Sequence, residues 1–356
     1  MTANPFPARR LAVGWIWLSA ALALTACAAD QDGGRDAAAL DHLTVISHDS
    51  FVLSDEAKAR FEADSGLTVD YIAPGNAGTV VNQLVLTKDS PLADVVVGID
   101  NTFAGRAIDQ GVLEPYASPA RPAGLDPALT IDGDWLTPVD YGDVCLNADQ
   151  QWFAQHDLTQ PRTLDDLTRP EYANLLVVTN PATSSPGLAF LAATVGAKGD
   201  PGYLDYWESL KANGLKVDSS WSDAYGVDFS GSSGQGAYPL VLSYASSPLY
   251  EVGDDGTSRT VALPQTCFRQ VEYAGVISQA SNPEGAQRFI DFLLSDAVQS
   301  EIPQTMYMSP VSPTAAVPAD WAGLATLVTD PITVPAEVIA AQREDWIKAW
   351  TETVLG

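Results

Sequence analysis

Tyrosine and tryptophan residues gather in short polar segments of the chain. Trp221 and Tyr225 lie in WSDAYG, Tyr244 and Tyr250 lie in SYASSPLYE, and Tyr307 lies in MYMSP. Flat aromatic rings stack on flat ligands and attract cations over their faces, which contributes about 0.5–2 kcal/mol per ring. Ser, Gly, Asp and Pro surround these rings, and such residues are usually exposed. The pattern predicts a binding site for a planar, cationic ligand, and half-buried packing is the alternative for any single ring.

The chain offers no recognisable set of residues for nucleophilic or metal chemistry. It has three histidines, and it contains no HExxH motif, no phosphate-binding P-loop and no GxGxxG turn after a predicted strand. Its GSSG segment at 231–234 lacks the GxSxG spacing of a nucleophile elbow. We therefore expect a protein that is not an enzyme and uses no metal or cofactor. A hydrolase with an unrecognised reactive serine is the alternative.

The composition favours an acidic globular protein with two domains. The formal net charge is −27, which argues against a nucleic-acid ligand and is compatible with a cationic one. Hydrophobic residues make up 46% of the chain, which fits a globular protein. The ~315 residues beyond the N-terminal region exceed what one small core accommodates, so we expect two domains.

Alternating strand and helix patterns surround the aromatic segments and predict a mostly parallel sheet covered by helices on both faces. Strands are predicted at 43–48, 67–73, 93–100, 174–180, 215–220, 239–244 and 271–277. Helices are predicted between the N-cap Ser54 and Gly66, at 76–89, after the N-cap Ser185, at 282–295 and at 335–356. In such sheets ligands bind beyond the carboxyl ends of the strands, where most of the aromatic residues fall.

Residues 1–26 have the layout of an export signal. Two arginines precede an apolar run at 11–26, which is shorter than the ~20 residues needed to cross a bilayer. The run closes with Leu-Thr-Ala before Cys27, which resembles a bacterial lipobox. The resemblance implies lipidation of Cys27, a flexible tether at 27–42 and anchoring to the outer face of the cell membrane, on the periplasmic side where a second membrane is present. A retained N-terminal membrane anchor is the alternative.

Two further cysteines, Cys145 and Cys267, are candidates for a disulfide. They lie 122 positions apart, and an even number of cysteines in an exported domain favours pairing. A bridge that closes so long a loop contributes up to roughly 4–5 kcal/mol in the chain-entropy model. Two separate buried thiols are the alternative.

A series of motifs runs in order through the chain from residue 43 to the C-terminus. The most specific are WSDAYG and LVLSYASSPLY, and the others include LTVISHDSF, ADVVVGIDN, PVDYG, TSSPGLAF, QVEYAG, IPQTMYMSPV and PAEVIAAQREDWIKAW. Together they resemble the thiamine-binding periplasmic proteins of ABC importers. The resemblance implies an α/β, two-lobed type II periplasmic binding protein fold with the ligand cleft between the lobes.

The resemblance also implies a mode of action. The ligand is thiamine, one of its phosphate esters or a related cationic heterocycle, and a monomeric protein delivers it to an ABC permease and its ATPase. We expect lobe 1 to contain residues 43–140, lobe 2 to contain 141–271, and residues 272–356 to return to lobe 1 and end in a helix. Hinge crossings are expected near 139–141 and 271–273, where closure around the ligand excludes water and strengthens polar contacts.

Residue by residue, the resemblance extends the predicted site. Trp221, Tyr244 and Tyr250 match positions that line the family's cleft, and Tyr225 lies beside them. Ser184 matches a serine that holds the hydroxyethyl or phosphate end of the ligand, close to a helix N-terminus whose free amides attract oxygen atoms. A helix cap is the alternative role of this serine.

Other predicted contacts depart from the family's pattern. His48 replaces a tyrosine, Tyr307 replaces a tryptophan, and Asn76 and Ala77 replace an Asp-Gly pair at the phosphate end. Asp143 replaces an aromatic residue, and it either pairs with the thiazolium or the aminopyrimidine amine or is a solvated loop charge. These departures leave the choice of heterocycle open. An iron(III)-binding or a polyamine-binding protein of the same fold is the alternative, although no two tyrosines are adjacent as iron ligands often are.

Overall fold

The computed structural model describes residues 41–232, 236–321 and 328–356, and all of them belong to one compact unit of the chain. The predicted export signal and Cys27 lie outside the described residues. Within the described ranges, no helix is both long enough and apolar enough to cross a membrane.

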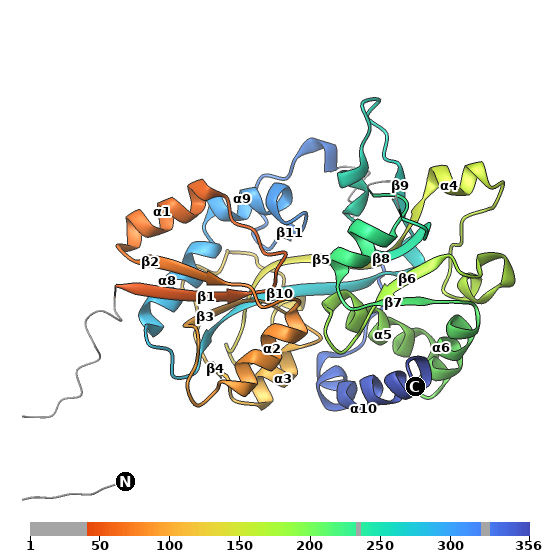
Figure 1. The fold of residues 1–356 in the computed structure, drawn as a ribbon. Coiled ribbons are helices and arrows are strands. Elements are labelled where there is room, and N and C mark those ends of the chain that lie inside the picture. The colour runs from red at the N-terminus through yellow and green to blue at the C-terminus, as the bar shows by residue number, and fades with distance from the viewer. Residues whose placement is uncertain (1–40, 233–235, 322–327) are drawn as a thin grey trace, which may run out of the picture. The chain divides into compact units, whose positions relative to one another are not determined.

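The strands of the described residues form a single sheet (Figure 1). They are β1 (His42–Ser47), β2 (Thr68–Ile72), β3 (Val95–Asp100), β4 (Leu113–Glu114), β5 (Thr137–Asp149), β6 (Leu176–Thr179), β7 (Lys216–Asp218), β8 (Leu240–Tyr244), β9 (Thr260–Ala262), β10 (Phe268–Ile277) and β11 (Ser309–Pro310). Their order is β2-β1-β3-β10-β5-β8-β6-β7, with β4 beside β10, and with β9 and β11 beside β5.

Helices cover both faces of this sheet. They are α1 (Asp55–Ser65), α2 (Ala77–Leu86), α3 (Ala104–Asp109), α4 (Gln150–Gln155), α5 (Ser185–Lys198), α6 (Gly202–Ala212), α7 (Trp221–Asp223), α8 (Pro283–Leu293), α9 (Asp296–Thr305) and α10 (Ala336–Val354). Shorter helical turns are η2 (Pro127–Leu129), η3 (Asp165–Thr168), η4 (Pro170–Tyr172), η5 (Ala224–Asp228), η6 (Ser247–Glu251), η7 (Pro264–Thr266) and η8 (Ala319–Trp321). Helices α1, α8 and α9 share one core with β1, β3 and β10, whereas α2, α3 and α5 pack into a second core on the other face.

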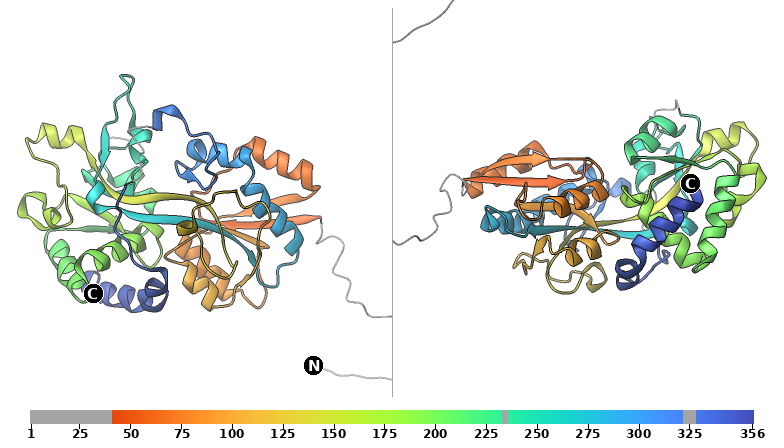
Figure 2. Two further views of the ribbon diagram at one scale, coloured as in Figure 1. Left: turned by 180° about the vertical axis from the view of Figure 1, so that it is seen from behind. Right: turned by 60° about the horizontal axis from the view of Figure 1, so that its bottom comes forward.

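The long strands β5 and β10 carry the sheet through both lobes. We define lobe 1 by β1–β4 with α1–α3, α8 and α9, and lobe 2 by β6–β9 with α4–α7. Strand β10 pairs antiparallel with β3 in lobe 1 and with β5 along most of its length. Figure 2, seen from behind, shows these two strands running side by side through both lobes. The predicted crossings near 139–141 and 271–273 fall inside β5 and β10, and the lobe boundaries themselves stay a prediction.

Helix ends follow the predicted capping chemistry, with one correction. The Ser54 side chain accepts a hydrogen bond from the Ala57 N–H at the start of α1, and Gly66 ends this helix with a left-handed φ of 74°. The predicted N-cap Ser185 is wrong by one residue. Ser184 has the extended backbone of an N-cap and accepts from the helix, so that Ser185 is the first helical residue of α5.

The C-terminal helix α10 contacts both lobes. Arg106 of α3 pairs with Glu344 at 2.7 Å, and Trp350 meets Trp207 of α6 edge-on with centroids 5.5 Å apart. We expected the chain to return to lobe 1 and end there in this helix. The helix packs against lobe 1 only in part, because its second half packs against lobe 2.

Candidate functional site

A pocket opens between the two lobes where several strands and helices end. The space inside it, counted together with the open solvent at its mouth, is about 710 Å³. Six of the nine predicted ligand contacts line it, namely His48, Asn76, Trp221, Tyr244, Tyr250 and Tyr307. The structure thus brings these six side chains to one place, and their contact with a ligand stays a prediction.

Trp221 forms one wall of the pocket, with Tyr225 behind it. The two rings stack with centroids 5.1 Å apart and 17° between their planes. The indole N–H donates to the Ser243 hydroxyl at 3.0 Å, and the indole ring meets the Tyr244 ring edge-on at 6.4 Å. Tyr225 is buried, does not line the pocket and donates its hydroxyl to Glu251 at 3.0 Å. It therefore supports Trp221 from behind and does not face the pocket itself.

Tyr250 and Tyr307 meet at the mouth of the pocket from opposite lobes. Tyr250 lies in η6, Tyr307 lies between α9 and β11, and their rings stack with centroids 3.7 Å apart. The Tyr307 backbone has a left-handed φ of 53°, which is costly for a bulky residue. Strained residues of this kind cluster at functional sites, which fits a role for Tyr307 in closing the pocket.

Three carboxylates on neighbouring strands form a row, which we call the acidic row, and one of them reaches the pocket. Glu272 of β10 lies opposite Asp100 of β3 on one side and opposite Asp140 of β5 on the other. Directly paired residues share a face of the sheet, with Cβ atoms ~4.5–5.5 Å apart. Their exposed fractions are only 6%, 0% and 1%, and Glu272 is the member that lines the pocket.

The two aspartates of the acidic row differ in their hydrogen bonds. Asp100 accepts from the Thr102 N–H at 2.6 Å and from the Ser185 hydroxyl, which crosses from lobe 2. Asp140 Oδ1 is buried with no hydrogen-bond partner in the described structure. Burial, followed by the charge of Glu272, raises the pKa of Asp140 well above its ordinary value, and burial also raises the pKa of Asp100. Burial thus opposes the charged form of both aspartates.

His48 is the positively ionisable side chain beside Glu272. Its Nε2 lies 3.2 Å from Glu272 Oε2, and its Nδ1 accepts from the Ser50 backbone N–H at 3.2 Å. Burial lowers the pKa of His48, but the Glu272 carboxylate, helped by Asp49 and Asp100, outweighs burial and raises this pKa above 6.5. The neighbouring carboxylates therefore favour the protonated form of this histidine more than burial opposes it.

Two helix N-termini lie at the pocket, those of α2 and α5. Asn76 is the N-cap of α2, makes no side-chain capping bond and lines the pocket. Ser184 caps α5, is fully buried and donates to Thr179 Oγ1 at 2.9 Å, so it does not line the pocket. Its neighbour Ser185 does line it. For Ser184 the geometry supports the helix-cap role over ligand contact.

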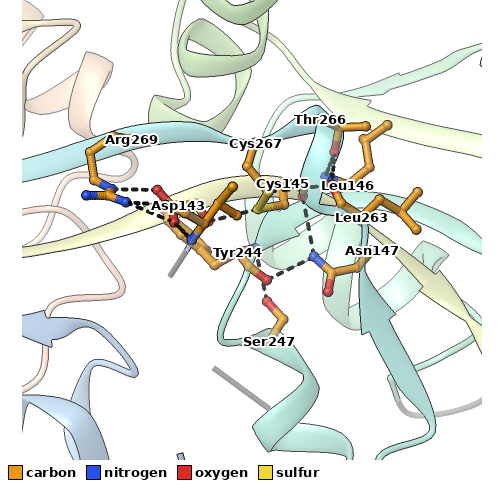
Figure 3. Close-up of a disulfide and its surroundings, with 11 residues drawn as sticks. Asp143, Cys145, Leu146, Asn147, Tyr244, Ser247, Leu263, Thr266, Cys267 and Arg269 are labelled. Carbon is orange, nitrogen blue, oxygen red and sulfur yellow. Dashed lines mark hydrogen bonds and ion pairs between the residues drawn. A yellow bond between two sulfur atoms is a disulfide. The ribbon is translucent and has the colours of Figure 1, made fainter. Parts of the chain in front are cut away.

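Asp143, a predicted ligand contact, does not line this pocket. Its carboxylate is fully buried and pairs with Arg269, with Nε–Oδ1 at 2.5 Å and Nη2–Oδ2 at 3.3 Å (Figure 3). The Val328 N–H also donates to it at 2.7 Å. The Arg269 guanidinium lies 5.7 Å from the Tyr141 ring centroid. The carboxylate thus forms a structural ion pair that ties β5 to β10.

The predicted disulfide between Cys145 and Cys267 is confirmed. The two cysteines are bonded, with Cα atoms 4.2 Å apart, and both are buried (Figure 3). Cys145 lies on β5 and Cys267 lies immediately before β10. The bridge therefore cross-links the two strands that pass through both lobes.

Sequence reasoning missed Glu272, Met306 and Met308 among the lining residues. Met306 and Met308 flank Tyr307 in the same motif. Glu272 sits inside an apolar strand, and a charged residue in such a run is a signal for a functional site. Asp100 and Asp140 carry the same signal. Within the described residues, however, no group of three or more His, Cys, Asp or Glu side chains is placed to hold a metal ion.

Sequence comparison relates this chain to bacterial transport proteins. Residues 90–325 match the model of a family described as bacterial extracellular solute-binding protein. The thiamine-binding periplasmic protein of Escherichia coli (strain K12) is 30% identical over 322 residues, covering 88% of this chain and 93% of that protein. The protein of the same name from Brucella suis biovar 1 (strain 1330) is 28% identical over 326 residues, covering 88% and 92%.

Comparison of structures gives the same result. A solved periplasmic thiamin binding protein is 28% identical and has a TM-score of 0.77, covering 88% of this chain and 96% of that one. The apo ferric ion-binding protein A of Pasteurella haemolytica, at 16% identity and a TM-score of 0.69, supports the fold alone. The expected two-lobed type II fold is confirmed. The chain belongs to the bacterial extracellular solute-binding proteins, and its homologues include thiamine-binding periplasmic proteins.

Proposed function

We propose that this protein binds thiamine outside the cytoplasm and delivers it to an ABC permease, without a catalytic step. The observation that carries the proposal is the meeting of aromatic walls with the Glu272 carboxylate in one interlobe pocket. Thiamine joins a flat aminopyrimidine to a flat thiazolium with a fixed positive charge. The names of the relatives support the same ligand.

Each part of the pocket has a complementary part on thiamine. Trp221 and Tyr244 offer aromatic faces or edges to the two rings, at about 0.5–2 kcal/mol for each cation–π contact. Glu272 offers a carboxylate to the thiazolium charge or to the aminopyrimidine amine. Ser185 and Asn76, beside two helix N-termini, suit the hydroxyethyl end or a phosphate ester at that position.

Delivery requires the pocket to open and close. In the proposed mechanism β5 and β10 act as the hinge, and closure brings Tyr250 against Tyr307 at the mouth. Closure excludes water, which strengthens the electrostatic contacts of the ligand. A permease then recognises the closed form, and reopening releases thiamine into the permease.

The proposed location is the outer face of the cell membrane. The lipobox-like segment before Cys27 supports a diacylglycerol anchor at that residue, and residues 27–42 then form the tether. The relatives are named as periplasmic proteins, which supports export. We propose a monomer, because one chain supplies both lobes of the pocket.

A thermal-shift experiment on the purified full chain tests the ligand. The panel contains thiamine, its mono- and diphosphate, an uncharged thiazole, spermidine and ferric ion. Thiamine at 100 times its dissociation constant is expected to stabilise the fold by about 2.7 kcal/mol, whereas the uncharged thiazole has little effect. Stabilisation by ferric ion or spermidine with no response to any thiamine form would refute the proposed ligand.

A further inference from the structure

The helix N-termini at the pocket decide between a hydroxyl and a phosphate at the far end of the ligand. Residues from the start of α2, Asn76 and Ala77, and from the start of α5, Ser185 and Pro186, line the pocket. We propose that the pocket selects thiamine over its phosphate esters, because most hydrogen-bond donors at these helix ends are already engaged and carboxylates lie beside them. The inference rests on the proposed function, with the hydroxyethyl end of thiamine at the two helices.

The N-terminus of α2 is closed by a carbonyl group from the opposite lobe. The Gly78 N–H donates to the Thr183 carbonyl oxygen at 3.1 Å, and Thr183 lies just before α5 in lobe 2. A β-carbon on Gly78 would lie 2.8 Å from the same oxygen, so the two backbones are in direct contact. The next amide, that of Thr79, donates to the Asn76 carbonyl at 2.8 Å. The Thr183 oxygen thus uses a donor that a bound phosphate would need.

The N-terminus of α5 also offers few donors. Its second residue is Pro186, which has no backbone N–H, and the Gly187 N–H donates to the Ser184 hydroxyl at 3.5 Å. The Ser185 hydroxyl donates to a carboxylate of the acidic row in lobe 1. At most the first backbone amide of each helix, that of Ala77 or Ser185, therefore remains for a ligand. Two amides suit one hydroxyl oxygen, whereas a phosphate presents three strongly accepting oxygens.

The charge of the pocket opposes a phosphate as well. Among the lining residues that the structure describes, Asp49 and Glu272 carry carboxylates and none is Lys or Arg. The Asp49 N–H donates to the Gly75 carbonyl at 3.0 Å, which places Asp49 beside the N-cap Asn76 of α2. The lining histidine, His48, is directed at Glu272, with Nε2 3.2 Å from Oε2. A phosphate monoester carries about −1.5 to −2 at pH 7, and it would lack the Lys or Arg partner that such groups usually have.

This arrangement predicts a clear order of affinities. Thiamine is a cation, whereas its monophosphate carries an additional negative group toward Asp49 and the acidic row. We expect thiamine to bind at least about tenfold more tightly than the monophosphate, and the diphosphate to bind more weakly still. Because Asp49 is exposed, its share of this difference is expected to decrease as the salt concentration rises.

Titration calorimetry with the full chain measures the affinities for thiamine, its monophosphate and its diphosphate at about pH 7.5. Asp49→Asn removes the charge beside α2, and we expect it to narrow the ratio between thiamine and monophosphate about threefold. Asn76→Lys adds a positive charge at the same helix end and is expected to strengthen monophosphate binding. The matched control is Asp89→Asn, which makes the same charge change at an exposed residue beyond the other end of α2 and should leave the ratio unchanged.

Two results would overturn the selectivity and leave thiamine as the ligand. One is monophosphate binding by the wild type that is as tight as thiamine binding or tighter. The other is a ratio that Asp49→Asn changes no more than Asp89→Asn does. If Asp49→Asn does not fold, the ratio of the wild type decides the matter. Failure of the wild type to bind any of the three compounds would instead refute the proposed function itself.

Discussion

Breaking the Cys145–Cys267 disulfide is expected to destabilise the protein by up to about 5 kcal/mol at 25 °C. The bonded cysteines are 122 residues apart, and the chain-entropy relation for a loop of that length gives about 16 cal/mol/K. The adjoining segments of β5 and β10 are also paired through their backbones. The native geometry is thus held without the bridge, and the effect falls mainly on the unfolded chain.

Guanidinium unfolding of the oxidised and the reduced wild-type chain, followed by tryptophan fluorescence, measures this difference. Chemical reduction introduces no substitution and therefore no new cavity. The reduced chain is expected to unfold at lower denaturant concentration and with a larger m value, because its unfolded state is more expanded. The Cys145→Ala/Cys267→Ala variant is the control, since reductant should not change its unfolding.

Identical unfolding midpoints for the oxidised and reduced wild type would refute this reasoning about the unfolded chain. The bridge also joins the two strands of the proposed hinge, so reduction is expected to change the rates of thiamine association and release in stopped-flow fluorescence. Unaltered rates and unaltered affinity would show that the bridge does not restrict the hinge.

Three further substitutions separate binding from stability. Trp221→Ala is expected to weaken thiamine binding by about 1–3 kcal/mol through lost ring contacts, and unchanged affinity in calorimetry would contradict its place at the ligand. Asp143→Ala is expected to lower the free energy of unfolding by about 2–4 kcal/mol, because it leaves Arg269 without its carboxylate, while thiamine affinity stays the same. Asp140→Asn is expected to stabilise the fold increasingly as pH rises above about 3.9, because the raised pKa of the wild-type carboxyl makes its folding less favourable there. A denaturant series at several pH values checks this, and a constant difference between variant and wild type contradicts it.

Much of the fold could be predicted because it depends on local patterns. Apolar runs gave strands such as β3 and β8, and the start and end of α1 followed from Ser54 and Gly66. The long strand β5 was not recognised as one element, because its 13 residues include charged and polar positions that are buried only by their neighbours. The placement of α10 against two lobes likewise depends on contacts far apart in the sequence.

The candidate site, too, could be predicted from the sequence only in part. The aromatic walls were predictable, since large rings in Ser- and Gly-rich segments at strand ends are visible in the sequence. The acidic row was not predictable from the sequence, because Asp100, Asp140 and Glu272 are brought together only by the register of three strands. The ion pair of Asp143 was not predictable for a related reason, because its partner Arg269 comes from the neighbouring strand.

A crystal structure of the full chain grown with saturating thiamine tests the central claim most directly. The account predicts one thiamine molecule between the lobes, with its rings against Trp221 and Tyr244 and its positive end toward Glu272. An empty interlobe pocket under those conditions, or thiamine bound elsewhere on the chain, would contradict it.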